Sequence, residues 1–160
     1  MIKVIVLIGL IYCVFGASIH FQDCGSLGSY TVDEVILDVP CQSQPCWVPV
    51  KTKTDATVSF KSSNLTALDM TTDVNVLVAN NRKRIEVTPV TCPKSVCPIR
   101  ADESKVYSIQ INPNFHVEPI RVEIYWEATN QLQDELFCVT FPVIVYNPET
   151  YKPGGNYKHI

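Results

Sequence analysis

Residues 137–145 read Phe-Cys-Val-Thr-Phe-Pro-Val-Ile-Val, a stretch in which every odd-numbered position is apolar. Successive side chains of an extended strand point to opposite faces, so an apolar period of two predicts a half-buried strand of an antiparallel sheet. Proline has no backbone N–H to give to a neighbouring strand. We therefore expect Pro142 either at a sheet edge or with its nitrogen directed away from the adjacent strand.

The same alternation of apolar and polar positions recurs along the chain. It is found at residues 35–39, 56–60, 74–78, 85–87, 107–111 and 120–126. Turn-forming residues separate these segments, at 62–64, 80–81, 93–95, 112–114 and 129–131. No segment has a helical pattern of comparable strength, and about seven strands with such turns are typical of an immunoglobulin-like β-sandwich. The predicted fold class is therefore all-β, with two antiparallel sheets.

The two ends of the chain do not share this alternation. Lys3 is followed by an apolar run over residues 4–15 and then by small residues, which is the layout of a secretory signal peptide. The run is shorter than the roughly 18 apolar residues that span a bilayer, which argues against an uncleaved anchor. We predict a signal peptide at 1–16, one domain at 17–146 and a flexible tail at 147–160. The predicted location is extracellular, with the lysosomal lumen as the alternative.

The cysteines predict covalent cross-links. Of the seven cysteines, Cys13 falls in the leader, which leaves six in the mature chain. An even number of cysteines in an exported protein predicts disulfides. The economical pairing joins the two closely spaced pairs and the two outer cysteines, although other connectivities stay open: Cys24–Cys138, Cys41–Cys46 and Cys92–Cys97. A four-cysteine zinc site is the alternative, but the oxidising export route disfavours it, and we predict no metal.

Other residues bear on function mainly by exclusion. The chain has 13 basic and 16 acidic residues, a formal net charge of −3, which gives no broad basic surface for nucleic acid. Its histidines, His20, His116 and His159, are scattered, and no hydrolase or phosphate-binding motif occurs. Bridged cysteines leave no catalytic thiol, so we predict no enzyme activity and no cofactor. Asn64 begins an Asn-Leu-Thr sequon, which is a predicted glycosylation site.

Several short motifs resemble one family in particular. They are FQDCGS at 21–26, QPC at 44–46, CPI at 97–99 followed by YS at 107–108, Trp126, LFC at 136–138 and PV at 142–143. With the cysteines in register over about residues 21–146, the chain resembles the ML lipid-recognition domain family, and within it the luminal second Niemann-Pick type C type and its arthropod relatives. The resemblance implies a sandwich splayed at one end around an apolar ligand such as a sterol or fatty acid. It also implies the disulfide pairing given above, no catalytic residues and no metal.

The resemblance indicates where such a ligand would lie. Apolar side chains on the inner faces are candidate pocket walls, because a ligand between two sheets is enclosed by their inward-facing residues. The candidates are Val74, Val76, Ile85, Val87, Tyr107, Ile109, Phe115, Val117, Ile120, Val122, Ile124, Trp126, Val139 and Phe141. Phe115 and Val117 follow Asn112 and Pro113, where the family has the mouth of its pocket.

One segment departs from the sterol-binding relatives, in which an apolar stretch precedes the second small cysteine loop. Here residues 80–87 include Arg82, Lys83 and Arg84. They form either a solvated hairpin tip or a cationic pocket rim that pairs with a carboxylate, a phosphate or an anionic membrane surface. We predict a monomeric, secreted carrier of a sterol, a fatty acid or a similar amphiphile. The alternatives are an innate-immune protein that presents a microbial lipid to a receptor, and an adhesion module with a closed core.

Overall fold

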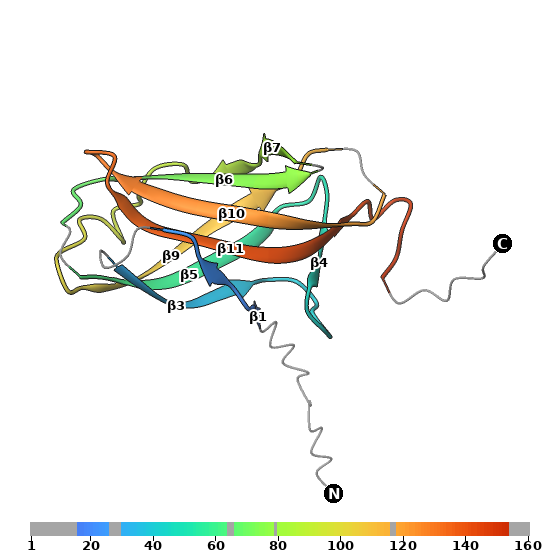
Figure 1. Ribbon diagram of the computed structural model, residues 1–160, viewed down its shortest axis with the longest axis horizontal. Helices are drawn as coiled ribbons and strands as arrows, with labels where there is room; N and C mark the ends of the chain where they lie inside the picture. Colours follow the sequence, from blue (N-terminus) through green and yellow to red (C-terminus); the bar gives the residue numbers. More distant parts are fainter. Residues whose placement is uncertain (1–15, 26–29, 64–65, 79, 116–117, 154–160) are drawn as a thin grey trace, which may run out of the picture.

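The computed structural model describes residues 16–25, 30–63, 66–78, 80–115 and 118–153. The regular elements in these ranges are eleven β-strands, which form two layers packed face to face (Figure 1). In the same ranges, no helix has the length and hydropathy needed to cross a membrane. Parts of the predicted organisation lie outside the described residues: the leader at 1–15, Asn64, Val117 and the end of the tail at 154–160.

One layer is a five-stranded antiparallel sheet. Its strand order is β1 (Ala17–Ser18), β3 (Tyr30–Leu37), β5 (Thr54–Ser62), β9 (Ser104–Asn112) and β8 (Glu86–Thr88). The register aligns Val35, Val58 and Tyr107 across three neighbouring strands, and all three side chains are fully buried. Because paired residues of adjacent strands point to the same face, this row belongs to the inner face of the sheet.

The other layer is a six-stranded sheet. Its order is β2 (Gln22–Asp23), β11 (Glu135–Tyr146), β10 (Ile120–Asn130), β6 (Met70–Val78) and β7 (Asn81–Arg84), with β4 (Cys46–Pro49) parallel to the end of β11. The register places Trp126 of β10 between Val74 of β6 and Val139 of β11. All three are buried, so this row faces the five-stranded sheet.

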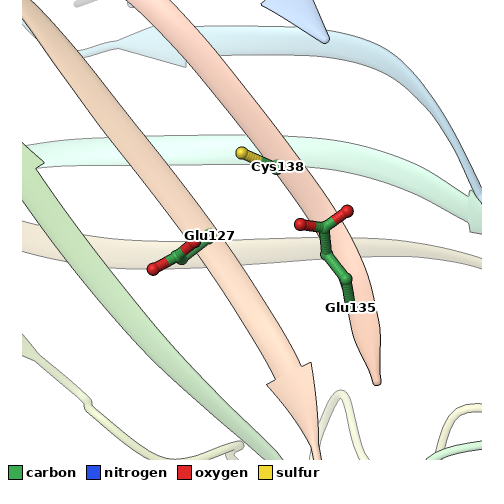
Figure 2. A group of neighbouring side chains, drawn as sticks. All are labelled: Glu127, Glu135 and Cys138. Carbon is green, nitrogen blue, oxygen red and sulfur yellow. The ribbon is translucent and has the colours of Figure 1, made fainter. Parts of the chain in front are cut away.

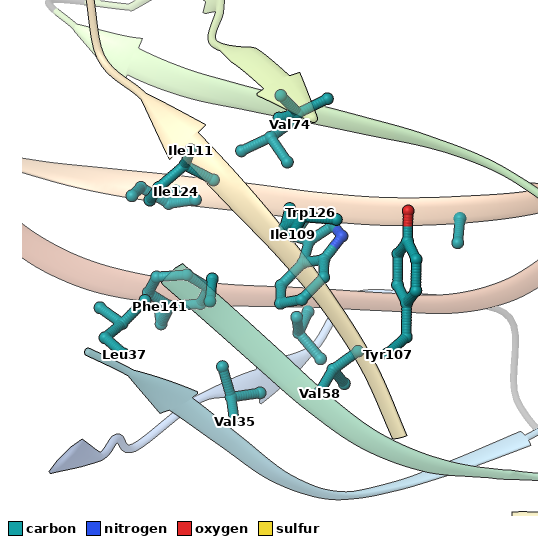
Figure 3. Close-up of a cluster of buried hydrophobic side chains, with 14 of the residues drawn as sticks. Val35, Leu37, Val58, Val74, Tyr107, Ile109, Ile111, Ile124, Trp126 and Phe141 are labelled. Carbon is teal, nitrogen blue, oxygen red and sulfur yellow. The ribbon is translucent and has the colours of Figure 1, made fainter. Parts of the chain in front are cut away.

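The two inner faces meet in one continuous apolar core (Figure 3). Trp126 connects the layers, because its ring packs edge-on against Phe137 of its own sheet, with centroids 5.5 Å apart, and against Tyr107 of the opposite sheet at 6.2 Å. Phe60 of the five-stranded sheet packs against Phe137 at 5.0 Å. Large aromatic side chains bury much apolar area, so these contacts contribute strongly to holding the layers together.

Pro142 lies within β11, which has neighbours on both sides. The N–H of Cys138 donates to Tyr30 Oη at 3.1 Å and therefore points away from β10. Successive backbone groups alternate along a strand, so the nitrogen of Pro142 points to the same side. On that side β2 pairs with β11 at residues 139–140 and β4 pairs with it from Val143 onward. The second of the two predicted alternatives therefore holds, and the missing donor costs no ladder bond.

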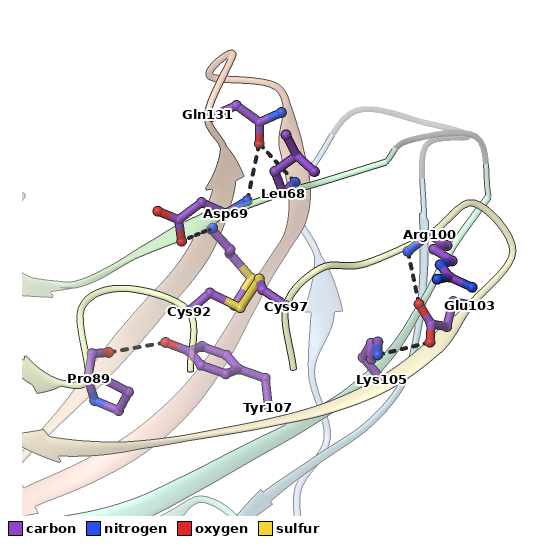
Figure 4. Close-up of a disulfide and its surroundings, with 11 residues drawn as sticks. Leu68, Asp69, Pro89, Cys92, Cys97, Arg100, Glu103, Lys105, Tyr107 and Gln131 are labelled. Atoms are coloured by element: carbon purple, nitrogen blue, oxygen red, sulfur yellow. Dashed lines mark hydrogen bonds and ion pairs between the residues drawn. A yellow bond between two sulfur atoms is a disulfide. The ribbon is translucent and has the colours of Figure 1, made fainter. Parts of the chain in front are cut away.

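The structure contains the predicted disulfides, Cys24–Cys138, Cys41–Cys46 and Cys92–Cys97. Cys24–Cys138 connects the end of β2 to β11 within the six-stranded sheet, where the N–H of Cys24 also donates to the carbonyl oxygen of Cys138 at 3.0 Å. Cys41–Cys46 closes the turn before β4. Cys92–Cys97 closes a turn in the loop between β8 and β9 (Figure 4).

Backbone hydrogen bonds connect the two layers at the end that carries the Cys92–Cys97 loop. This loop joins two strands of the five-stranded sheet, but it pairs with β6 of the other sheet. The N–H of Thr72 donates to the carbonyl oxygen of Val90 at 2.9 Å, and the N–H of Cys92 donates to that of Met70 at 2.8 Å. The sandwich is therefore closed at this end by main-chain pairing as well as by side-chain packing.

The beginning of the predicted flexible tail forms an ordered turn. Asn147 is buried, its Oδ1 accepts from the N–H of Glu149 at 3.0 Å, and its carbonyl oxygen accepts from the N–H of Tyr151 at 2.9 Å. The turn brings the ring of Tyr151 onto Trp47 of β4, with centroids 5.0 Å apart and planes 4° from parallel. An asparagine-based turn and a ring stack therefore hold residues 147–151, and the flexible tail stays a prediction for the residues that follow.

The stack predicts a measurable contribution to stability. We expect Tyr151→Ala to lower the free energy of unfolding by about 1 kcal/mol, since aromatic pairs contribute on this order beyond the area that they bury. Urea unfolding followed by tryptophan fluorescence measures the change. Tyr151→Phe keeps the ring and is the matched control, so an equal loss in both variants would show that the ring stack contributes nothing.

Candidate functional site

The inner faces contain most of the side chains predicted to line a pocket. At most 6% of each is exposed for Val74, Val76, Ile85, Val87, Tyr107, Ile109, Val122, Ile124, Trp126, Val139 and Phe141. Phe115 is partly buried and packs against the same core. The structure therefore brings these residues together between the sheets, whereas Val117 lies outside the described part of the chain. Burial is required of a pocket wall and of ordinary core alike, so the assignment of individual walls stays a prediction.

Ile120 differs from the other predicted wall residues. It is 36% exposed at the start of β10, although its position follows the inward alternation of Val122 and Ile124. The cause is the pairing of β10. Ile120 is paired with Val145 on one side, while β6 pairs with β10 only from Glu123 onward. Ile120 therefore lies at an end of the sandwich that is only partly covered, instead of within the buried wall.

An apolar cleft adjoins the interior at one edge of the sandwich. The chain leaves the six-stranded sheet at the end of β7 and enters the five-stranded sheet with β8, and Ile85 is the residue of the crossing. The cleft has a volume of about 480 Å³ and is lined by Arg84, Ile85, Glu86, Val87 and Val90. Ile85 and Val87 also belong to the buried core, so the cleft touches the space between the sheets. Its volume lies within the range typical of small-molecule sites.

The structure places the predicted cationic segment, Arg82, Lys83 and Arg84, on an exposed strand at the edge of the six-stranded sheet. Residues 81–84 form the edge strand β7, in which Arg82 pairs with Leu77 and Arg84 with Asn75, on the outer face of the sheet. The guanidinium of Arg82 lies over the ring of Tyr125 at 4.9 Å, and Arg84 Nε lies 2.7 Å from Asp73 Oδ1.

Only Lys83 pairs with an inward-facing residue, Val76, and its own side chain is exposed. Arg82 and Arg84 therefore lie on the outer face of the sheet, although Arg84 also lines the apolar cleft, and the role of the segment as a pocket rim stays a prediction. Their contacts on the outer face, which a linear motif does not reveal, account for this orientation.

Polar groups inside the sandwich are hydrogen-bonded to one another. Trp126 Nε1 donates to Thr72 Oγ1 at 2.8 Å, and Thr72 Oγ1 donates to the carbonyl oxygen of Glu127 at 3.2 Å. Tyr107 Oη donates to the carbonyl oxygen of Pro89 at 3.1 Å (Figure 4). Burial raises the pKa of Tyr107 to about 12, because the charged phenolate is disfavoured away from water.

Thr72 is the residue that sequence reasoning missed. It is fully buried and shares the inward alternation of Met70 and Val74. The available signal was its place in the alternation of inward-facing residues along β6, but a polar threonine is not recognised as a core residue by its type.

A group of carboxylates on the outer side does not form a metal site. Possible ligand atoms of Glu127, Glu135 and Cys138 lie within 4.8 Å of one another (Figure 2). The sulfur of Cys138 is bonded to Cys24, however, and a disulfide sulfur lacks the thiolate charge that binds zinc. The donor set therefore does not fit a transition-metal centre.

Tyr30 explains part of this arrangement. Its Oη lies 3.0 Å from Asp23 Oδ1 and 3.2 Å from Glu135 Oε1. Burial, followed by the hydrogen bond to Asp23 and the negative charge of Glu135, raises the pKa of Tyr30. The neutral hydroxyl of Tyr30, at the start of β3, thus contacts both β2 and the start of β11 in the opposite sheet, which is a structural role.

The fold and the interior define the class of the protein. The structure is a disulfide-linked sandwich of two antiparallel sheets with an apolar core, and two residues of that core line an apolar cleft of the kind that takes a small apolar ligand. The family model described as the ML domain matches residues 18–145. The chain therefore belongs to the ML domain family.

Individual relatives agree with this assignment. The chain is 26% identical over 126 residues to the NPC intracellular cholesterol transporter 2 of Sus scrofa, covering 78% of this chain and 83% of that protein. It is 26% identical over 145 residues to the protein of the same name from Mus musculus, covering 87% and 93%. The crystal structure of a Niemann-Pick type C2 protein from the Japanese carpenter ant superposes with a TM-score of 0.65 at 17% identity, covering 79% of this chain and 98% of that one. The last comparison supports the fold.

Proposed function

We propose that this protein is a secreted carrier that holds one hydrophobic ligand, a sterol, a fatty acid or a similar amphiphile, between its sheets. The observation that carries the proposal is the apolar cleft at the Ile85 crossing, which touches the buried core. Membership of the ML domain family supports a lipid as the ligand, and the named relatives are cholesterol transporters. The predicted leader at 1–16 and the disulfides support passage through an oxidising secretory route.

The driving force would be the transfer of apolar ligand surface out of water. Each buried methylene contributes roughly 0.8 kcal/mol, so a long acyl chain or a ring system gains several kcal/mol after the cost of ordering is subtracted. The inner faces offer aliphatic and aromatic side chains for this contact, and the buried polar atoms of Trp126, Thr72 and Tyr107 are already hydrogen-bonded. A mainly apolar ligand therefore suits the interior.

Native mass spectrometry of the secreted protein tests the proposal. We expect one bound lipid per chain, whose mass distinguishes a sterol from a fatty acid. Displacement of a fluorescent fatty acid and of a fluorescent sterol measures the affinity for each class. A protein with no bound lipid and no affinity for either probe is not a carrier.

A substitution at the cleft locates the route of access. Val90 is 41% exposed and lines the cleft, so Val90→Trp fills the cleft without entering the core. We expect the affinity for the lipid probes to fall by about tenfold, which corresponds to roughly 1.4 kcal/mol. Val106 is 61% exposed on β9 and does not line the cleft, so Val106→Trp is the matched control. Equal affinities of the two variants would place access elsewhere.

A further inference from the structure

A second and larger cleft lies on the outer face of the six-stranded sheet. It has a volume of about 550 Å³, and its lining comprises His20, Phe21, Gln22, Arg121, Glu123, Tyr125, Thr140 and Pro142. The strand register brings four of these residues together at the base of the cleft, because Glu123 pairs with Pro142 and Tyr125 pairs with Thr140. These positions alternate with the inward residues Val122, Ile124 and Phe141. The cleft is therefore separated from the interior by the sheet itself.

The hollow arises from the short strands beside β11. β2 pairs with β11 at only two residues, and β4 begins its pairing at Val143. The segment at 141–142 thus has no strand beside it on that side, and Pro142 needs none. A smaller hollow of about 320 Å³ adjoins on the side of β6, lined in part by Arg121 and Glu123, which both hollows share.

The charged groups in and beside this cleft differ in their hydrogen-bond and ion-pair partners. Glu123 accepts a hydrogen bond from Thr140 Oγ1 at 3.2 Å. Within the described part of the chain, neither Arg82 nor Arg121 has a carboxylate at ion-pair distance, and Glu123 likewise has no cation at that distance, so the local balance is two guanidinium groups to one carboxylate. Arg82 lies over the ring of Tyr125, which lines the cleft. The outer face therefore presents two guanidinium groups beside a half-buried aromatic ring.

These features fit an acidic protein segment better than a membrane. A concave surface receives a protruding loop, whereas a lipid bilayer is broad and flat, so the shape of the cleft favours a protein segment. Guanidinium groups bind carboxylates through paired N–H donors, and arginine with aromatic residues dominates the energetic centres of protein interfaces. Phe21, Pro142 and Tyr125 offer apolar contact next to the cations.

We propose that the outer-face cleft docks an acidic segment of a protein partner. A carboxylate of the segment lies against Arg121, the arginine of the lining, and an adjacent apolar side chain packs on Phe21, Tyr125 and Pro142. The proposal is independent of the lipid-carrier function, because the cleft and the interior lie on opposite faces of the sheet.

A random dodecapeptide display library, selected on the full secreted chain, tests this docking. Peptides are first depleted on Arg121→Ser and then selected on the unaltered protein. We expect enrichment of Asp or Glu next to an aromatic or aliphatic residue. Synthetic peptides from the selection should bind Arg121→Ser about tenfold or more weakly, and Asp-to-Asn or Glu-to-Gln changes in the peptide should have a similar effect.

Arg100→Ser is the matched control, because Arg100 is an exposed arginine beside Glu103 in the loop before β9 (Figure 4) and does not line the cleft. Peptide binding should be unchanged in this variant. The proposal is overturned if no peptide distinguishes Arg121→Ser from the unaltered protein, or if the arginine controls binding to phosphatidylserine vesicles and not to peptides. Binding of the fluorescent lipid probes by the same samples reports on the carrier function separately.

Discussion

Removal of the disulfide between Cys24 and Cys138 is expected to lower the free energy of unfolding by about 4.7 kcal/mol, the chain-entropy value for a loop of roughly 100 residues. The two cysteines are 114 positions apart, so this bond restricts most of the chain in its unfolded state. Cys24→Ala with Cys138→Ala removes it. Because proteins of this size have only about 5–15 kcal/mol of stability, the variant should be close to its unfolding transition at body temperature.

Urea unfolding followed by circular dichroism measures this loss. The matched control is Cys41→Ala with Cys46→Ala, which removes a disulfide whose cysteines are only 5 positions apart. The same entropy model gives the short loop about 2 kcal/mol. Losses of equal size in the two variants would contradict the argument from loop length and would indicate that local contacts of each bridge decide its contribution.

Replacement of Trp126 is expected to have the second large effect. Trp126 is 1% exposed, contacts Phe137 and Tyr107, and donates a hydrogen bond to Thr72. Trp126→Ala creates a cavity between the sheets and should lower the free energy of unfolding by about 3–5 kcal/mol. Trp47→Ala is the natural comparison, because Trp47 is the only other tryptophan and its ring is half-buried on the opposite side of the sheet. We expect about 1–2 kcal/mol there.

The hydrogen bond can be separated from the packing by a double-mutant cycle. Trp126→Phe keeps much of the ring and removes the donor, and Thr72→Val keeps the shape and removes the acceptor. We expect a coupling energy of about 1 kcal/mol between the two changes, since each single variant leaves one buried polar group without its partner. Additive losses would mean that the indole contributes through packing alone.

The sequence predicted the sandwich because strands leave a short-range pattern: alternation over residues 120–126 and 137–145 identified the two longest strands. Cysteine spacing made the disulfide pairing the economical one, and the family resemblance implied the same pairing, including the bridge between cysteines 114 positions apart. The edge strand β7 was not predicted, because all four of its residues are exposed and carry no apolar alternation. Such a strand is held by main-chain hydrogen bonds to β6, and main-chain hydrogen bonds do not require particular side chains.

The residues of the candidate sites also divide into those that local patterns predict and those that depend on contacts between strands. The inward positions of β6, β9 and β10 follow from the alternation of side chains along each strand, which can be read without knowing the neighbouring strand. The direction of Arg82 and Arg84 depends on the register between β6 and β7, and a slip of one residue would place both on the opposite face. The outer-face cleft depends on where β2 and β4 end along β11, and neither short strand was expected. Contacts between segments distant in sequence therefore determine the direction of the arginines and the position of the outer-face cleft, which residue patterns alone do not reveal.

The main-chain pairing of β6 with residues 90–92 also governs how the sandwich can deform. No disulfide links a strand of one sheet to a strand of the other, so relative movement of the layers breaks no covalent bond. At Met70 and Thr72, by contrast, the layers are pinned by hydrogen bonds. A ligand that enters beside Val90 would therefore be accommodated by a change of angle between the sheets, with the pairing at Met70 and Thr72 as the pivot and the larger displacement towards Ile120. Ligands of different thickness would then require only a change in the angle between the two sheets, without rearrangement within either sheet.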